Sequence, residues 1–110
     1  MSLSGEEWEI LETEEFEKEF NKLPKEIQSR FEQQIIKVKD DLFSIGKPLG
    51  YVWFRELKNK KYRLYFIIYD REIIILLVNI SDKNNQKKVI DKIKQNFNWF
   101  KGFIRNDYKD

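Results

Sequence analysis

Residues 51–80 have the sequence YVWFRELKNKKYRLYFIIYDREIIILLVNI, which carries the clearest structural signal in the chain. It contains three runs rich in aromatic and β-branched residues, at 51–57, 61–69 and 73–80. Such runs favour β-strands, and the polar breaks Asn59-Lys60 and Asp70-Arg71 between them are short enough for hairpin turns. The stretch therefore predicts three antiparallel strands in a meander. Because the third run is apolar on both faces, we expect that strand to be central or covered on both sides.

Two helices are predicted ahead of this meander. Residues 8–12 first predict a short strand, and Thr13 then stands where a helix N-cap is expected. Apolar residues follow at helical spacing, which predicts one helix over residues 14–22 and a second over residues 25–44. The two apolar stripes are Phe16, Phe20 and Leu23, and then Ile27, Phe31, Ile35, Val38 and Leu42. Pro24 suits the first turn of the second helix, so the pair is predicted to form a helical hairpin.

A loop and a final helix flank the meander. The residues that predict the loop are Gly46, Pro48 and Gly50. After the third strand, Ser81-Asp82 offers a cap for a helix over residues 84–98. The tail over residues 99–110 carries aromatic side chains without a clear period, and we expect it to dock on the core or on a partner.

These elements indicate one α+β domain over residues 1–110. We expect an N-terminal helical hairpin packed on a small antiparallel β-sheet, with a C-terminal helix. A chain of 110 residues has the size of one domain, and its 41% of hydrophobic residues is enough for a packed core. Residues 1–3 are set aside as a cloning remnant.

The composition excludes several kinds of chemistry. The chain has neither cysteine nor histidine, which removes disulfides, thiolate or imidazole metal sites and histidine-based triads. Any catalysis must therefore use Lys, Arg, Tyr, Asp or Glu, and we expect no metal and no cofactor. The longest apolar run, residues 73–78, is far shorter than the roughly 20 residues of a membrane-spanning helix. With no secretion leader visible, we expect a cytoplasmic protein without membrane contact.

The net charge of +2 conceals an asymmetry along the chain. Residues 1–46 hold 6 Lys/Arg and 12 Asp/Glu, whereas residues 47–110 hold 15 Lys/Arg and 7 Asp/Glu. A segment as basic as the second one can attract a polyanion, for which nucleic acid is the usual candidate. The alternative interpretation is an ordinary solvated surface.

Strand alternation predicts a cationic patch in the meander. On the second strand, Arg63 and Tyr65 share one face, while the neighbours Leu64 and Phe66 form the natural core face. If Arg55 on the preceding strand faces the same way, two guanidiniums and a phenol come together. Lys58, Lys60 and Lys61 lie at the turn beside them. Guanidiniums bind phosphate oxygens through two parallel hydrogen bonds, so this patch suits a phosphodiester.

Cleavage of RNA by its own 2′-hydroxyl needs a base, cations that hold charge on the phosphate, and an acid. Arginine supplies the cation. The base and the acid are harder to assign without histidine. The options are Glu56, Tyr65 or a crowded lysine. Neighbouring cations favour the phenolate form of tyrosine and the neutral amine form of lysine, which suits the role of a base. Each residue also has a structural interpretation. Arg63 can pair with Glu56, Tyr65 can be packing on the sheet, and the lysines can be ordinary surface residues.

The combined pattern resembles the RelE/ParE toxin superfamily, and within it the HigB-like and archaeal RelE-like branches. The segments that carry the resemblance are residues 46–50, 54–58, 62–66, 73–78 and 81–86. The resemblance implies a helical hairpin on a small antiparallel sheet. It also implies a type II toxin that cleaves mRNA on the ribosome and so inhibits translation, an mRNA interferase. The expected partners are the ribosome, mRNA and a helical, DNA-binding cognate antitoxin.

By this resemblance, Arg63 matches the strand arginine that contacts the scissile phosphate. Our candidate catalytic residues are Arg63, Arg55 and Tyr65. Our candidate RNA-binding residues are Lys58, Lys60, Lys61, Lys83 and Lys87. Two alternatives stay open, namely a catalytically inactive RelE-like module that only binds protein, and a gyrase inhibitor like the ParE branch.

Overall fold

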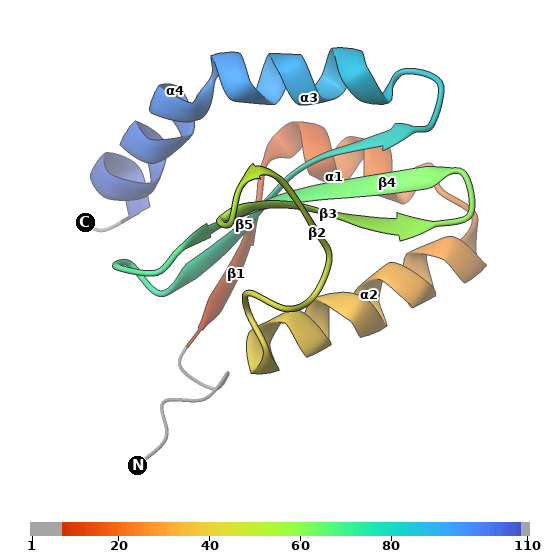
Figure 1. The fold of residues 1–110 in the computed structure, drawn as a ribbon, viewed down its shortest axis with the longest axis horizontal. Helices are drawn as coiled ribbons and strands as arrows, with labels where there is room; N and C mark the ends of the chain where they lie inside the picture. The colour runs from red at the N-terminus through yellow and green to blue at the C-terminus, as the bar shows by residue number, and fades with distance from the viewer. Residues whose placement is uncertain (1–7, 109–110) are drawn as a thin grey trace.

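The meander predicted from residues 51–80 is present, and it is part of a larger sheet (Figure 1). The computed structural model describes residues 8–108. Its five strands lie in the order β1-β5-β4-β3-β2. Their bounds are β1 Glu9–Glu12, β2 Lys47–Tyr51, β3 Phe54–Asn59, β4 Tyr62–Tyr69 and β5 Ile74–Asp82. The strands β3, β4 and β5 pair antiparallel, which confirms the predicted meander.

The sheet differs from the prediction at both edges. Strand β1 pairs parallel with β5, so the sheet is mixed rather than purely antiparallel. At the other edge, residues expected to form a loop pair with β3 as β2. Pro48 is tolerated there because an edge strand needs no hydrogen bond from every N–H. Gly46 and Gly50 have φ of 87° and 96°, which gives β2 an irregular path that alternation in the sequence does not reveal.

The helical hairpin is confirmed as α1 (Glu14–Asn21) and α2 (Lys25–Asp40). Thr13 caps α1 as predicted, because its Oγ1 accepts a hydrogen bond of 3.0 Å from the Phe16 N–H. The same hydroxyl donates to the Val78 carbonyl at 2.8 Å, which ties the helix to β5. Helix α2 ends four residues before the predicted boundary. No helix of residues 8–108 has the length and apolar character needed to cross a membrane.

The C-terminal part is more helical than predicted. The expected single helix is interrupted at Asn96, which separates α3 (Gln86–Gln95) from α4 (Phe97–Gly102). A π-helical turn, η2 (Phe103–Tyr108), follows. Phe100 and Ile104 are buried, so the tail docks on the core of its own chain. Residues 1–3, and the tail beyond 108, lie outside the described residues.

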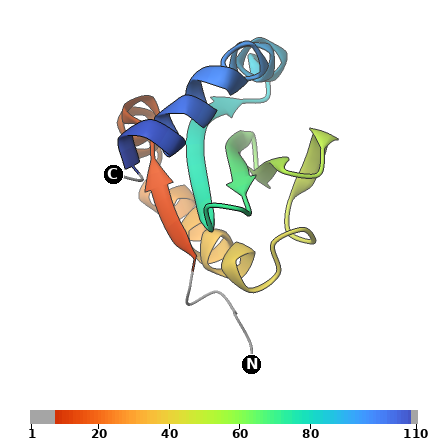
Figure 2. The ribbon, with the colours of Figure 1, turned by 90° about the vertical axis from the view of Figure 1, so that its left-hand side faces the viewer.

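Helices cover both faces of the sheet (Figure 2). One core lies between the sheet and α1–α2 and includes Phe31, Leu64 and Phe66. The other lies against α3–α4 and includes Tyr65, Ile67, Ile93, Phe100 and Ile104. Strand β5 contributes to both cores, which confirms the expected covering of the third strand. The face of β4 that carries Arg63 and Tyr65 is therefore a second buried face and not an open surface.

Candidate functional site

A group of polar side chains lies on the α3-facing side of β3, β4 and β5. Strand register places Glu56 opposite Tyr65, and Arg63 between Lys58 and Ser81. Glu56, Arg63, Tyr65 and Ser81 are all buried. Polar groups in such a place need hydrogen-bond partners, and within the described residues no fully buried side-chain N or O atom lacks one.

Arg63 is held in place by backbone oxygens and a carboxylate. Its Nη1 donates to the carbonyls of Lys60 at 3.0 Å and Tyr62 at 3.1 Å. Its Nε lies 4.0 Å from Glu56 Oε2, so the pairing with Glu56 that the sequence allowed is present. About 10% of the Arg63 side chain is exposed.

Part of the Arg63 guanidinium still faces solvent. Neither Nε nor Nη2 makes a hydrogen bond to the described residues, since the Glu56 carboxylate is too distant for one. Within the described residues, every fully buried side-chain nitrogen has a hydrogen-bond partner, so Nε and Nη2 of Arg63 are not fully buried. Arg63 thus keeps two nitrogens outside the protein's hydrogen bonds, of which Nε lies within ion-pair distance of Glu56.

Glu56 connects the sheet to the start of α3. Its Oε1 accepts a hydrogen bond of 2.8 Å from Gln86 Nε2, and Gln86 is the first residue of α3. The Glu56 side chain is 6% exposed. Sequence reasoning did not assign a role to Gln86, because nothing in the local pattern shows which strand residue the first turn of this helix reaches.

Tyr65 is fully buried, and its hydroxyl lies 2.8 Å from Ser81 Oγ. Burial raises the pKa of Tyr65 to about 12, and the nearby Glu56 also raises it, whereas the Ser81 hydrogen bond and Arg63 act in the opposite direction. Arg63 thus favours the phenolate, as neighbouring cations were expected to do, but burial outweighs it and the net shift of the Tyr65 pKa is upward. In this structure Tyr65 is a neutral packing and hydrogen-bonding residue that supports the strand beside Arg63.

Arg55 lies on the opposite face of the sheet. Its partner on β4 is Phe66, which packs toward α1–α2. The guanidinium donates to three backbone carbonyls, those of Ile45 at 2.9 Å, Gly46 at 2.9 Å and Val52 at 3.0 Å. The expected patch of two arginines and a tyrosine does not form. The register pairs Arg55 with Phe66, so the Arg55 side chain lies on the face of the sheet opposite Arg63 and Tyr65. The hydrogen bonds of Arg55 instead connect the residues directly before β2 with the residue directly after it.

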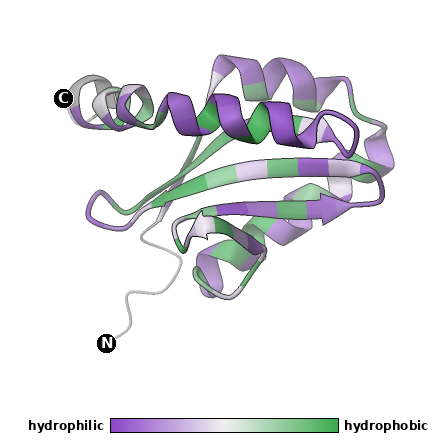
Figure 3. Ribbon diagram, turned by 45° about the horizontal axis from the view of Figure 1, so that its top comes forward, coloured by the Kyte–Doolittle hydropathy of each residue, from purple (hydrophilic) through white to green (hydrophobic). Residues whose placement is uncertain are grey.

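The predicted RNA-binding lysines gather at one end of the sheet. Lys58, Lys60 and Lys61 flank the β3–β4 turn, and Lys83 and Lys87 lie after β5 and in the first turn of α3. All five are exposed. The turn and the start of α3 are both hydrophilic and lie at the same end of the molecule (Figure 3), and the register places Arg63 between Lys58 and Ser81 at that end of the sheet. We call these five residues the lysine rim.

Local contacts already engage two members of the lysine rim. The Lys61 ammonium lies 5.4 Å from the centre of the Tyr62 ring, and Lys87 forms an exposed ion pair of 2.9 Å with Asp91. Exposed pairs of this kind contribute little stability, so these lysines remain available to a stronger anion.

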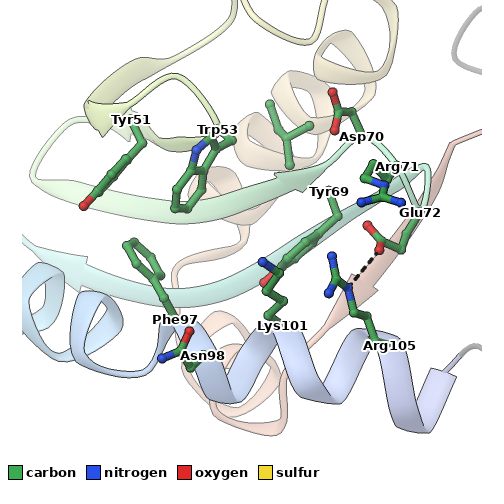
Figure 4. A pocket seen from close by; sticks show the side chains of 11 residues that line it. Tyr51, Trp53, Tyr69, Asp70, Arg71, Glu72, Phe97, Asn98, Lys101 and Arg105 are labelled. Atoms are coloured by element: carbon green, nitrogen blue, oxygen red, sulfur yellow. Dashed lines mark hydrogen bonds and ion pairs between the residues drawn. The ribbon is translucent and has the colours of Figure 1, made fainter.

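A cavity of about 420 Å³ lies at the other end of the sheet (Figure 4). Its walls include Tyr51, Trp53, Tyr69 and Phe97, and charged side chains such as Arg71 and Lys101 line it as well. Sequence reasoning missed this site, because it depends on α4, which was expected to be an irregular tail. Within residues 8–108, no group of three acidic side chains is placed to hold a metal ion.

No protein-family model matches this chain, and no curated protein sequence matches it. Solved structures of RelE toxins do match. A free Escherichia coli RelE carrying two arginine-to-alanine substitutions has a TM-score of 0.68 at 15% identity, with 80% of this chain and 96% of that chain covered.

Two complexes with antitoxins match as well. The Mycobacterium tuberculosis toxin–antitoxin complex RelBE2 has a TM-score of 0.60 at 17% identity, with 74% and 94% of the two chains covered. The archaeal RelE–RelB complex from Pyrococcus horikoshii OT3 has a TM-score of 0.56 at 14% identity, with 70% and 96% covered. The chain therefore has the fold of RelE toxins, as the sequence pattern implied.

Proposed function

We propose that this protein is the toxin of a type II toxin–antitoxin system. The supporting observation is the fold, because the matches extend over nearly the full length of RelE chains, two of them in complexes with antitoxins. The likeness to toxins in such complexes supports an antitoxin as the partner, and the helical, DNA-binding character of that antitoxin is part of our proposal. The remaining question is what the toxin acts on.

We infer that its activity is ribosome-dependent cleavage of mRNA without a metal. The observation that supports this proposal is that Nε and Nη2 of Arg63 make no hydrogen bond to the described residues, beside the Glu56 carboxylate and the lysine rim. Lys58 and its neighbours attract the RNA backbone. Arg63 Nε and Nη2 then bind the oxygens of one phosphate, which stabilises the extra negative charge of the transition state.

Glu56 is the group best placed to accept a proton in this site. In the proposed reaction the 2′-hydroxyl loses its proton to Glu56 and attacks the adjacent phosphorus, and the bond to the 5′-oxygen breaks. The products are a 2′,3′-cyclic phosphate and a 5′-hydroxyl end, with the proton reaching the leaving oxygen from water or a rim lysine. Tyr65 acts only as a positioning residue, through its contact with Ser81.

The burial of Arg63 and Tyr65 favours a second candidate, a RelE-like module that binds its partner without cleaving RNA. In this alternative the Arg63–Glu56 pair is a structural contact between β3 and β4. The two candidates differ in one measurable respect, since only the first requires Arg63 for toxicity.

The test is induced expression in a bacterium, combined with mapping of mRNA ends on ribosomes. Arg63→Ala should abolish growth arrest and the new mRNA ends, whereas Arg30→Ala, at an exposed arginine on α2, should retain both. Growth arrest that survives Arg63→Ala refutes the assigned site. Arrest accompanied by DNA-damage signalling and intact mRNA would indicate gyrase as the target instead.

A further inference from the structure

A small pocket lies where α1, β5, α3 and α4 meet. Its volume is about 210 Å³, and we call it the Asn79 pocket after the β5 residue in its wall. Glu15 of α1, Lys92 of α3 and the α4 residues Trp99 and Phe100 line it as well. None of these residues belongs to the proposed cleavage site, so what the pocket binds does not depend on the cleavage of RNA.

The side chain of Asn79 is buried and lacks a partner. Asn79 is 4% exposed, and its carboxamide makes no hydrogen bond to the described residues. Every fully buried side-chain nitrogen or oxygen of those residues has a partner, so the Asn79 amide is not sealed in the core and reaches the pocket that it lines. Proteins seldom keep a polar group in such a place, because burial without a hydrogen bond costs free energy. The amide is therefore available to a ligand.

The other polar groups of the pocket are already engaged. Lys92 Nζ lies 3.3 Å from Oε1 and 3.2 Å from Oε2 of Glu15. Asn96 Nδ2 donates to the Lys92 carbonyl at 2.8 Å. Glu15 and Lys92 bring one charge of each sign, so the residues that line the pocket carry no net charge. This balance favours a neutral occupant over a phosphate or a carboxylate.

Trp99 and Phe100 give the pocket an apolar wall. Trp99 is 61% exposed, and its ring stacks on Phe103 with centroids 5.7 Å apart and meets Phe100 edge-on at 5.5 Å. An exposed indole held by two other rings is typical of surfaces that contact a protein partner, where tryptophan is enriched. The volume is below the roughly 300–1,000 Å³ of small-molecule sites, so the pocket suits one side chain rather than a whole cofactor.

A second carboxamide has the chemistry that matches Asn79. Such a group carries a donor and an acceptor side by side, so two carboxamides form two parallel N–H···O hydrogen bonds. The edge of a nucleobase offers a similar pattern, but each base of an RNA brings a phosphate with it. The first turn of α1, beside the pocket, holds Glu14, Glu15 and Glu17. Their charge repels a polyanion and attracts a basic protein segment.

We propose that the Asn79 pocket receives an asparagine or glutamine side chain of a protein partner. Asn79 holds the incoming carboxamide through two hydrogen bonds, and the methylene groups of the same side chain pack against Trp99. Basic residues of the partner segment lie over the acidic first turn of α1. The unpartnered amide is then a cost to the free protein that the complex removes.

The stability of the protein alone gives the first test. Asn79→Leu should raise the midpoint of urea unfolding, because it removes a buried polar group without breaking a hydrogen bond of the protein. Asn98→Leu is the matched control, since Asn98 is an exposed residue of α4 outside the pocket, and its midpoint should stay unchanged. A lower midpoint for Asn79→Leu overturns the proposal, because the amide then already has a partner in the folded protein, such as a bound water.

Two acetylated and amidated peptides give the second test, one with the sequence Lys-Leu-Gln-Leu-Lys and one with leucine in place of the glutamine. In a nuclear magnetic resonance titration, the glutamine peptide should bind about tenfold more tightly than the leucine peptide, and should shift the Asn79 side-chain and Trp99 indole N–H resonances. Asn79→Leu should reverse this preference, because the glutamine carboxamide would then be buried without a partner. Asn98→Leu should keep the preference of the parent.

Two further outcomes overturn the proposal. One is equal affinity of the parent for the two peptides, or a preference that Asn79→Leu does not change. The other is a shift of the Asn79 and Trp99 resonances with a 2′-O-methyl hexanucleotide but with neither peptide, which assigns the pocket to nucleic acid. Failure of the cleavage proposal has a different signature, because it concerns the toxicity of Arg63→Ala, and that variant should keep the preference for the glutamine peptide.

Discussion

Arg55 and Arg63 lie on adjacent strands but point to opposite faces of the sheet. The register pairs Arg55 with Phe66 on the α1–α2 side, and Arg63 with Lys58 on the α3 side. Each nitrogen of the Arg55 guanidinium donates to a backbone carbonyl, whereas Nε and Nη2 of Arg63 make no hydrogen bond to the described residues. The two arginines should therefore respond differently to substitution, one through stability and the other through activity.

The first prediction concerns stability. Arg55→Met keeps the aliphatic part of the side chain but removes the donors to three carbonyls, among them that of Gly46. We expect a loss of about 3 kcal/mol in the free energy of unfolding, since each lost bond of this kind costs about 1 kcal/mol. Urea unfolding followed by circular dichroism measures this. Arg30→Met is the control, and equal stability of the two variants would show that Arg55 does not hold β2.

The second prediction separates the activity of Arg63 from its structural contact. Arg63→Met should remove toxicity and should also lower the free energy of unfolding by about 2 kcal/mol, because Glu56 is left buried without its cation. Glu56→Gln added to Arg63→Met should restore most of this stability, because no unpaired charge then remains. The double variant should nevertheless stay non-toxic. Recovery of toxicity together with stability would mean that neither Arg63 nor Glu56, the proposed base, takes part in cleavage.

The third prediction concerns Gly46, directly before β2, and Gly50, within β2. A Cβ at Gly46 would lie 2.8 Å from the Glu56 carbonyl oxygen, whereas a Cβ at Gly50 meets nothing closer than the Lys94 ammonium at 3.8 Å. Both residues have positive φ, so alanine is strained at either one. Gly50→Ala should cost about 1 kcal/mol, and Gly46→Ala about 2 kcal/mol more because backbone must move. Similar unfolding midpoints for the two variants would contradict this.

Local signals account for what the sequence predicted correctly. Thr13 was identifiable as an N-cap because a hydroxyl followed by acidic residues and an apolar period is a local pattern. The faces of β4 were also correctly separated, since Leu64 and Phe66 share one core and Tyr65 and Ile67 share the other. Alternation shows which residues share a face, but it does not show what covers that face.

The errors came from contacts that are distant in the sequence. The burial of Tyr65 depends on α3, α4 and η2, where a break at Asn96 and a π-helical turn obscure the helical period. The cavity lined by Tyr51, Trp53 and Lys101 was missed for the same reason. Strand β2 was missed because its sequence, KPLGY, contains Pro and Gly, which ordinarily indicate a loop. Whether Arg55 and Arg63 shared a face depended on the register of β3 and β4, which the turn between them determines.

The last prediction follows from the raised pKa of Tyr65. A pKa of about 12 in the folded protein exceeds the ordinary value of 10, so folding favours the neutral phenol. The contribution to stability is fully present below pH 10 and is lost as the pH rises from 10 to 12. Burial also raises the pKa of Tyr69, which adds to the alkaline loss in the same direction.

Tyr65→Phe should therefore lose about 1 kcal/mol at pH 7, where the hydrogen bond to Ser81 is missing. Above pH 10 its stability should decline less steeply than that of the parent, because one buried phenol no longer ionises on unfolding. Urea unfolding at several pH values between 7 and 12 measures both effects. Ser81→Ala is the matched control, since it removes the same hydrogen bond but keeps the phenol and hence the steep decline. A constant difference between Tyr65→Phe and the parent across this range would show that Tyr65 ionises equally in the folded and unfolded chains.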